Sequence, residues 1–316
     1  MNRDYHDFPF GITRIDTHYI RPQMTAAYLL VENGRAVFIE TGPLLAAAKL
    51  LQALKRADLT PGDVDAVIVT HVHLDHAGGA GELMRLCPEA QLIVHPSGAK
   101  HLVNPEKLKA SATAVYGEER FKTTLGDIIA VDSERVVTPA DGDKLLVGGR
   151  ELLLIDTPGH ARHHLAVWDQ KSRGLFSGDS FGISYREFDG GTTPFIFPAT
   201  TPVQLDPELL HNTLDKIAGL KPERLYLTHF DSITYQPELL QTLHRQLDQY
   251  LELVKSSNSH QQLVAAINNH MRGVLEDIQS PVAEALIEPL LAADQELNAQ
   301  GLEVWLSRIN KNSENR

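Results

Sequence analysis

Short apolar runs alternate with stretches of helical period along the first two thirds of the chain. Tyr28–Val31 and Arg35–Glu40 predict a β-hairpin, because a Glu-Asn-Gly turn separates them. Leu44–Ala57 predicts a helix with its leucines on one face. Ala66–Thr70 is continuously apolar and predicts a buried strand.

The same parts recur as far as about residue 228. Strands joined by both hairpins and helices predict two mixed sheets facing each other, with helices outside. The further predicted strands are Leu92–Val94, Arg135–Thr138, Lys144–Val147, Glu151–Asp156, His164–Trp168, Leu175–Ser177 and Arg224–Thr228, and the further predicted helices are Ser97–Leu102, Pro105–Tyr116 and Asp206–Leu220.

The pattern changes after Pro237, where only helical periods remain. We therefore predict a main domain over residues 1–236 and a helical C-terminal region over residues 237–316. The predicted helices of that region are Pro237–Ser256, Gln261–Gln279, Pro281–Leu291 and Asn298–Ile309.

Composition and charge narrow the class of protein. With 42% apolar residues the chain can bury a core, and its net charge of −12 argues against nucleic acid as a partner. A small anionic substrate stays open, because bound metals can supply local positive charge. No apolar stretch is long enough to span a membrane and no signal segment stands at the N-terminus, so we expect a cytoplasmic protein without membrane association.

The cysteine count excludes two structural features. The single cysteine, Cys87, rules out an internal disulfide and a multi-thiolate metal site. Its position in a helical-looking segment before Pro88 favours a small buried hydrophobe over a nucleophile.

A dense cluster of histidines carries the chemistry. His71, His73, Asp75 and His76 follow the predicted buried strand and precede a glycine-rich turn. Imidazole and carboxylate are the ligands that borderline divalent metals prefer. Two histidines two residues apart on an extended strand end point the same way, so they can hold one metal, while Asp75 and His76 can face a second.

Three further residues of the same ligand types stand at later strand ends. His160 follows Glu151–Asp156, Asp179 follows Leu175–Ser177, and His229 follows the last predicted strand. The alternatives for the cluster at residues 71–76 are a chance arrangement or a surface patch with no role. Strand ends can converge on one edge of facing sheets, which favours the metal interpretation.

This ordered ligand set resembles the metallo-β-lactamase superfamily, in particular its glyoxalase II-like and diiron phosphodiesterase-like members. The resemblance implies an αββα sandwich with a helical C-terminal extension. It also implies that His71, His73 and His160 bind one metal, that Asp75, His76 and His229 bind another, and that Asp179 bridges both. Glu40 stands where relatives often carry Asp, and we expect it and His164 to support the ligands from behind.

The resemblance implies a dinuclear hydrolase. Two divalent ions, with zinc favoured and iron or manganese as alternatives, would hold a bridging hydroxide that attacks a phosphodiester, thioester or lactone. Asp75, Asp179 or a metal-bound water would supply the leaving-group proton, with Asp179 favoured. A diiron protein of the same fold that binds or senses oxygen, with weak or no hydrolase activity, is the alternative.

Substrate contacts are expected from the loops after Asp179. Tyr185 and Arg186 lie near the site by chain continuity, and the aromatic residues of segment 190–198 either wall a pocket or pack the helical region. The expected partner is a small-molecule substrate. Whether the helical region caps the pocket or forms a homodimer stays open.

Overall fold

The computed structural model describes residues 4–201 and 203–314, which fall into two compact units. The first unit comprises the chain up to Asp156, then His163–Gly178 and Pro222–Ser232. The second comprises Thr157–Arg162, Asp179–Lys221 and the chain from Ile233. The units interleave along the sequence, so each is described by itself, and the division at residue 236 stays a prediction.

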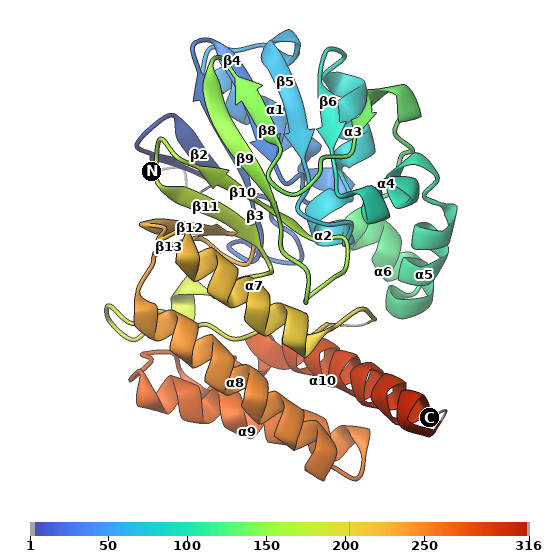
Figure 1. Cartoon of the computed structure of the whole chain (residues 1–316), viewed down its shortest axis with the longest axis vertical. Coiled ribbons are helices and arrows are strands. Elements are labelled where there is room, and N and C mark those ends of the chain that lie inside the picture. The colour runs from blue at the N-terminus through green and yellow to red at the C-terminus, as the bar shows by residue number, and fades with distance from the viewer. Residues whose placement is uncertain (1–3, 202, 315–316) are drawn as a thin grey trace. The chain divides into compact units, whose positions relative to one another are not determined.

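One sheet of the first unit has seven strands in chain order (Figure 1). Its first four strands form an antiparallel meander, and its last four run parallel. Parallel neighbours need crossover connections, which the intervening helices supply. The strands are β1 (Tyr5–Phe8), β2 (Ile12–Asp16), β3 (Ala26–Glu32), β4 (Arg35–Ile39), β5 (Val64–Ile68), β6 (Gln91–Ile93) and β7 (Val136–Val137).

The other sheet has six strands in the order β13-β12-β11-β10-β9-β8. Aromatic rings join the two sheets: the Tyr28 ring centre lies 5.2 Å from that of Phe176 and 5.4 Å from that of Tyr226. The predicted pair of facing mixed sheets is therefore confirmed. The strands are β8 (Lys144–Val147), β9 (Arg150–Asp156), β10 (Leu165–Asp169), β11 (Gly174–Gly178), β12 (Arg224–Leu227) and β13 (Ser232–Thr234).

Helices of the first unit cover the outer face of the seven-stranded sheet. Leu50 and Leu54 of α1 are buried there with Phe38 and Val67 of the sheet. Each such side chain contributes about 1.5–3 kcal/mol on burial. The helices are α1 (Ala47–Arg56), α2 (Leu74–Ala77), α3 (Ala80–Leu86), α4 (Pro96–Val103), α5 (Glu106–Tyr116) and α6 (Glu118–Arg120), with short helices η1 (Leu44–Ala46), η2 (Pro61–Asp63), η3 (Phe121–Leu125) and η4 (Ser133–Arg135).

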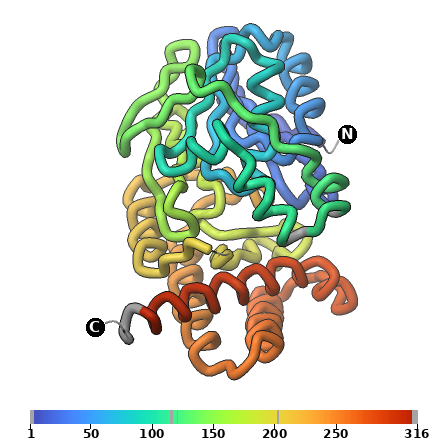
Figure 2. The backbone as a smooth tube through the Cα atoms, turned by 90° about the vertical axis from the view of Figure 1, so that its right-hand side faces the viewer, coloured from blue at the N-terminus to red at the C-terminus, as the bar shows by residue number. Residues whose placement is uncertain are grey.

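The second unit is helical. Leu239, Leu243 and Leu247 recur every fourth residue on α8, so one face of that helix is buried. Figure 2 shows α10 crossing α8 and α9, and contacts join these three helices. The helices are α7 (Pro207–Gly219), α8 (Pro237–Ser256), α9 (His260–Asp277) and α10 (Glu284–Glu314), with the short helix η5 (Arg186–Phe188).

One expectation from the sequence was wrong, and some strands were not predicted. The helices predicted at Pro281–Leu291 and Asn298–Ile309 are one helix, α10, which contains Pro289. The strands β1, β2 and β13 were not predicted. Within the described residues, no helix has both the length and the apolar character required to cross a membrane.

Candidate metal centre

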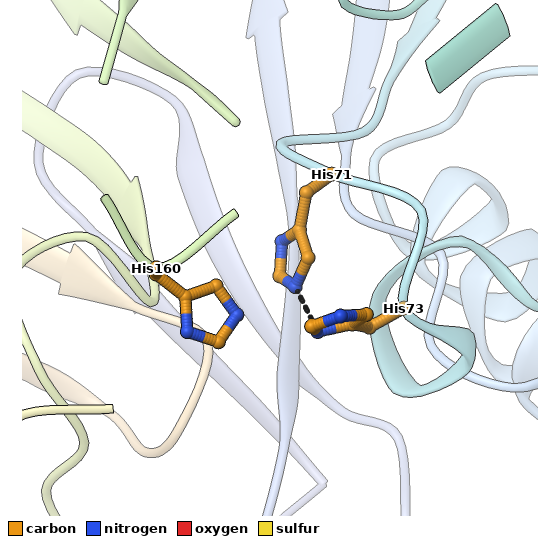
Figure 3. A group of neighbouring side chains, drawn as sticks. All are labelled: His71, His73 and His160. Carbon is orange, nitrogen blue, oxygen red and sulfur yellow. Dashed lines mark hydrogen bonds between the residues drawn. The ribbon is translucent and has the colours of Figure 1, made fainter. Parts of the chain in front are cut away.

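His71 and His73 follow β5, where the chain leaves the seven-stranded sheet. Nε2 of His71 lies 2.8 Å from Nδ1 of His73, and the rings meet edge to face at 78° (Figure 3). His73 is the residue before α2, which places Asp75 and His76 in the single turn of that helix. The backbone is extended up to His73 and helical after it. The side chains of His71 and His73 therefore leave the backbone in a different direction from those of Asp75 and His76.

Thr70 fixes the orientation of the His71 ring. Its hydroxyl lies 2.5 Å from Oε1 of Glu40 and 3.0 Å from Nδ1 of His71. A hydroxyl has one proton, and the carboxylate can only accept, so Thr70 donates to Glu40 and accepts from Nδ1–H of His71. Nε2 of His71 is then the nitrogen that carries the lone pair, on the side of His73.

Three donor atoms converge beside α2. Nε2 of His229 lies 3.0 Å from Oδ2 of Asp75, and Nε2 of His76 lies 3.8 Å from the same oxygen. The ligand atoms of the three residues lie within 4.8 Å of one another. His76 and His229 are buried, whereas the Asp75 side chain is 21% exposed. Solvent therefore reaches this group from the Asp75 side.

Glu40 makes hydrogen bonds to His76 of this group and to two neighbouring threonines. Its Oε1 lies 2.8 Å from Nδ1 of His76 and accepts from the hydroxyl of Thr228 at 3.1 Å, and its Oε2 accepts from the Thr70 amide at 3.2 Å. It is buried and holds a φ of +67°, a conformation that costs a non-glycine residue about 1–2 kcal/mol. Because Nδ1–H of His76 donates to Glu40, Nε2 is the nitrogen of that ring that carries the lone pair.

His164 stacks against His71, with ring centres 4.9 Å apart and planes 26° apart. Gly178, at the end of β11, comes close to both His164 and Thr70. A Cβ on Gly178 would lie 2.5 Å from the Thr70 hydroxyl and 2.6 Å from Nε2 of His164. Only glycine fits there, so the end of β11 lies against Thr70 and His164, next to the predicted ligand His71.

The second unit holds the other two predicted ligands. Nδ1 of His160 lies 3.0 Å from the carbonyl of Ala199, so Nδ1–H donates and Nε2 is left as the ligand atom. That Nε2 lies 3.6 Å from Oδ2 of Asp179. His160 comes from the loop after β9 and is drawn in Figure 3. These two ligand types thus meet each other within their own unit.

Tyr185 and Arg186 have partners inside the second unit. The Tyr185 hydroxyl donates to Asp294 of α10 at 3.1 Å, and the side chain is fully buried. Nη1 of Arg186 pairs with Asp189 at 3.1 Å. Phe188, Phe195 and Phe197 are buried around them, which favours packing of the helical region over a pocket wall. Substrate binding by Tyr185 and Arg186 stays a prediction.

Sequence reasoning missed the hydroxyl partners Thr70 and Thr228. A signal was present, because a threonine directly precedes both His71 and His229. The Tyr28 hydroxyl was also missed, and it donates to the carbonyl of Leu227, just before Thr228, at 2.5 Å. Burial raises the pKa of the Cys87 thiol to about 11, which agrees with a structural cysteine.

The donor set suits a divalent metal. Neutral imidazole nitrogens and a carboxylate oxygen are the ligands of zinc, iron and manganese. In metal sites a carboxylate often holds the second ring nitrogen of a ligand histidine, and Glu40 has this contact with His76, a predicted ligand.

The chain matches known proteins over most of its length. A family model described as the metallo-beta-lactamase superfamily matches residues 20–229. A metallo-beta-lactamase fold-containing protein of Sulfurisphaera tokodaii is 27% identical over 72% of this chain and 78% of its own. A hydroxyacylglutathione hydrolase of Xanthomonas campestris is 29% identical over 54% of this chain and 52% of its own.

Solved structures agree in fold. The crystal structure of an archaeal metallo-beta-lactamase superfamily protein from Sulfolobus tokodaii gives a TM-score of 0.66 at 24% identity, covering 92% of this chain and 98% of its own. The structure of the peroxy diiron species of the chemotaxis sensor ODP gives a TM-score of 0.53 at 15% identity, covering 76% of this chain and 93% of its own. At these identities the likeness extends to the fold alone.

Proposed function

Because the chain belongs to the metallo-beta-lactamase superfamily, we propose that it is a dinuclear metal-dependent hydrolase of an ester-type bond. One observation carries the proposal: Asp75, His76 and His229 gather their ligand atoms within 4.8 Å although His229 is far away in sequence. These three residues would hold one ion, and His71, His73 and His160 would hold the other, with Asp179 shared between them.

The covalent connections of His160 and Asp179 to the first unit support including these two residues in the proposed ligand set. Asp179 directly follows Gly178, so their Cα atoms are about 3.8 Å apart, and Gly178 adjoins Thr70 and His164. The loop Thr157–Arg162 leaves the first unit at Asp156 and returns to it at His163. Four residues of chain span at most about 14 Å, so His160 is tethered near the end of β9.

Two bound cations would supply a nucleophilic hydroxide at neutral pH and polarise the bond to be cleaved. The protein's own residues hold and orient the ligands: Thr70 fixes the His71 ring and Glu40 fixes the His76 ring. Asp75 is the ligand carboxylate with solvent access in the first unit, so it is placed to pass a proton to a leaving group, a role that it would share with Asp179.

The relatives favour one substrate class. Hydroxyacylglutathione hydrolases match about half of this chain, which supports a thioester ahead of a phosphodiester or a lactone. Those proteins are matched over only about half of their own length. Their substrate therefore does not identify the acyl group or the thiol of this chain's substrate.

The test is a substrate panel on the full chain loaded with zinc, iron or manganese. The panel contains bis-p-nitrophenyl phosphate, an S-acylglutathione and a γ-lactone. We expect hydrolysis of one class and a loss of about 10²-fold or more in His76→Ala. His6→Ala, a histidine at the exposed edge strand β1, is the matched control and should keep full activity.

Two results would overturn the proposal. Protein with two metals per chain that cleaves no member of the panel is not an ester hydrolase. An iron-loaded preparation that changes colour reversibly with oxygen, and hydrolyses nothing, would support the diiron oxygen-binding alternative.

A further inference from the structure

A segment without regular structure carries the hydrogen-bond acceptor of the proposed metal ligand His160. Nδ1 of His160 lies 3.0 Å from the carbonyl oxygen of Ala199, and residues 198–201 belong to no helix or strand. The Thr201 hydroxyl lies farther from the same nitrogen, at 3.5 Å. The orientation of the His160 ring therefore depends on what holds the Ala199 carbonyl in place.

The helix α10 holds the peptide group to which that carbonyl belongs. The amide N–H of Thr200 donates to Oδ1 of Asn298 at 2.7 Å, and the Thr200 hydroxyl donates to the same oxygen at 2.8 Å. Both side chains are buried. The peptide between Ala199 and Thr200 is trans, so it is planar and its C=O and N–H point in opposite directions. One rigid group thus joins Asn298 on one side to His160 on the other.

Gly301 brings the backbone of α10 against the same stretch of chain. A Cβ on Gly301 would overlap the carbonyl oxygen of Thr200 and would lie 2.7 Å from the carbonyl carbon of Thr201. Glycine inside a helix is less favourable than alanine, and this close approach is the reason for it here. Asn298 and Gly301 are three residues apart, so they share one face of α10.

We propose that Asn298 and Gly301 are positioning residues for the metal site. They fix the Ala199 carbonyl, which keeps a proton on Nδ1 of His160 and leaves the lone pair on Nε2 for the metal. The ring nitrogen that carries the proton is set by the hydrogen bonds of the ring. The bond from Thr200 N–H to Asn298 also makes the carbonyl a stronger acceptor, because hydrogen bonds in a chain polarise one another.

The helical region then takes part in metal binding without supplying a ligand. Asn298, Gly301 and His160 all belong to the second unit, whereas Asp75, His76 and His229 belong to the first. Loss of the Asn298 contact should therefore weaken the ion proposed at His160 and spare the other ion. This consequence rests on the proposed function, whereas the effect on the His160 ring does not.

The first experiment is nitrogen-15 NMR of the full chain, without metal, with labelled histidines. The His160 signals are identified by their absence from His160→Gln. We expect the proton on Nδ1 in the wild type and a mixture of both tautomers in Asn298→Ala. Thr200→Val removes only the hydroxyl and keeps the peptide N–H, so it should give the wild-type tautomer. An unchanged tautomer in Asn298→Ala overturns the proposal.

The second experiment is calorimetric titration of the full chain with zinc. We expect Asn298→Ala to weaken one of the two ions about 10-fold and to leave the other unchanged. Asn268→Ala is the matched control, because Asn268 of α9 also donates to a side chain of α10, Gln295, at 3.3 Å. It should leave both zinc affinities unchanged. Equal weakening of both ions by Asn298→Ala, or the same losses in Asn268→Ala, indicates a merely structural role and overturns the proposal.

A pair of glycine variants gives an independent test if Asn298→Ala folds poorly. Gly301→Ala should displace the Thr200 carbonyl and weaken the same single ion. Gly273→Ala, within α9, places a Cβ where nothing lies within 4 Å, so it should raise Tm by about 1–2 °C and leave zinc binding unchanged. Wild-type affinity for both ions in Gly301→Ala overturns the proposal. A chain that shows the expected ring and zinc effects but hydrolyses no ester contradicts the proposed function and supports this inference.

Discussion

Glu40 is the residue on which the described contacts of the metal centre converge. It accepts hydrogen bonds from Thr70 and Thr228 and meets Nδ1 of His76. All of these partners are donors, so the position requires a group that only accepts. The strained φ of +67° at Glu40 places that group between β4 and the end of β5.

Replacing Glu40 by Gln tests this role. The glutamine amide would turn its NH₂ toward at least one donor, so we expect the affinity for the ion at His76 to fall about 10–100-fold. Metal titration monitored by calorimetry measures the change. Glu40→Asp keeps the charge at a shorter reach and should lose less. If Glu40→Gln bound the metal with wild-type affinity, the carboxylate of Glu40 would not contribute to metal binding.

The candidate metal ligands could be predicted from the sequence, whereas the hydroxyl groups that hydrogen-bond to Glu40 and His71 could not. His71, His73, Asp75 and His76 stand out because four metal-binding side chains follow one buried strand. Thr70 and Thr228 are common residues whose role depends on the position of Glu40 in the fold. The hydrogen bond from Thr228 to Glu40 joins residues 188 positions apart in the sequence.

At the scale of elements, the approach of β11 to β5 depends on one glycine. We expect Gly178→Ala to destabilise the fold by about 1–3 kcal/mol, because its Cβ would collide with Thr70 and His164 at a φ of +50°. Displacement of Thr70 should also weaken metal binding. Urea unfolding and metal titration measure both effects.

Gly142 provides the matched control for that substitution. It also has a positive φ, of +87°, but a Cβ there would meet nothing within 4 Å. Gly142→Ala should show a smaller loss of stability and unchanged metal affinity. Equal effects of the two substitutions would mean that backbone strain alone, and not the contact with Thr70 and His164, explains the loss.

His260 joins the start of α9 to α10. Its hydrogen bonds with Glu296 and Glu303 raise the pKa of the ring above its usual value. A raised pKa stabilises the fold fully below about pH 6.5, the unfolded value, and this contribution disappears as pH rises through the folded pKa. Because the site is partly exposed, the contribution is small, under about 1 kcal/mol.

We therefore expect His260→Gln to reduce stability at pH 6 and to have little effect at pH 9. Chemical unfolding at the two pH values measures this difference. Glu303→Gln removes one of the two partners and should give part of the same loss. A loss in His260→Gln that grows with pH would contradict the assigned sign.

The helix α10 shows why some elements escaped prediction. Asp294, Gln295 and Asn298 occupy buried positions in its middle, so the apolar period breaks although the helix continues. These side chains have partners: Asp294 accepts from Tyr185, and Asn298 accepts from the amide of Thr200 at 2.7 Å. Hydrophobic periodicity cannot detect a helix whose buried face is hydrogen-bonded. The strand β1 escaped similarly, because it is a short, half-exposed edge strand.

At the scale of the whole molecule, the two units divide the proposed ligands between them. Five ligands belong to the first unit, and His160 and Asp179 belong to the second. The sequence predicted the facing sheets correctly because strands, hairpins and crossover helices each have a local pattern. Which loops belong to which unit depends on packing between distant segments, which no local pattern records.

The most direct measurement is anomalous X-ray diffraction from crystals of the zinc-loaded full chain. We predict two zinc peaks about 3.5–4 Å apart, one bound by Asp75, His76 and His229 and one by His71, His73 and His160. A single peak, or zinc bound away from these residues, would contradict the account.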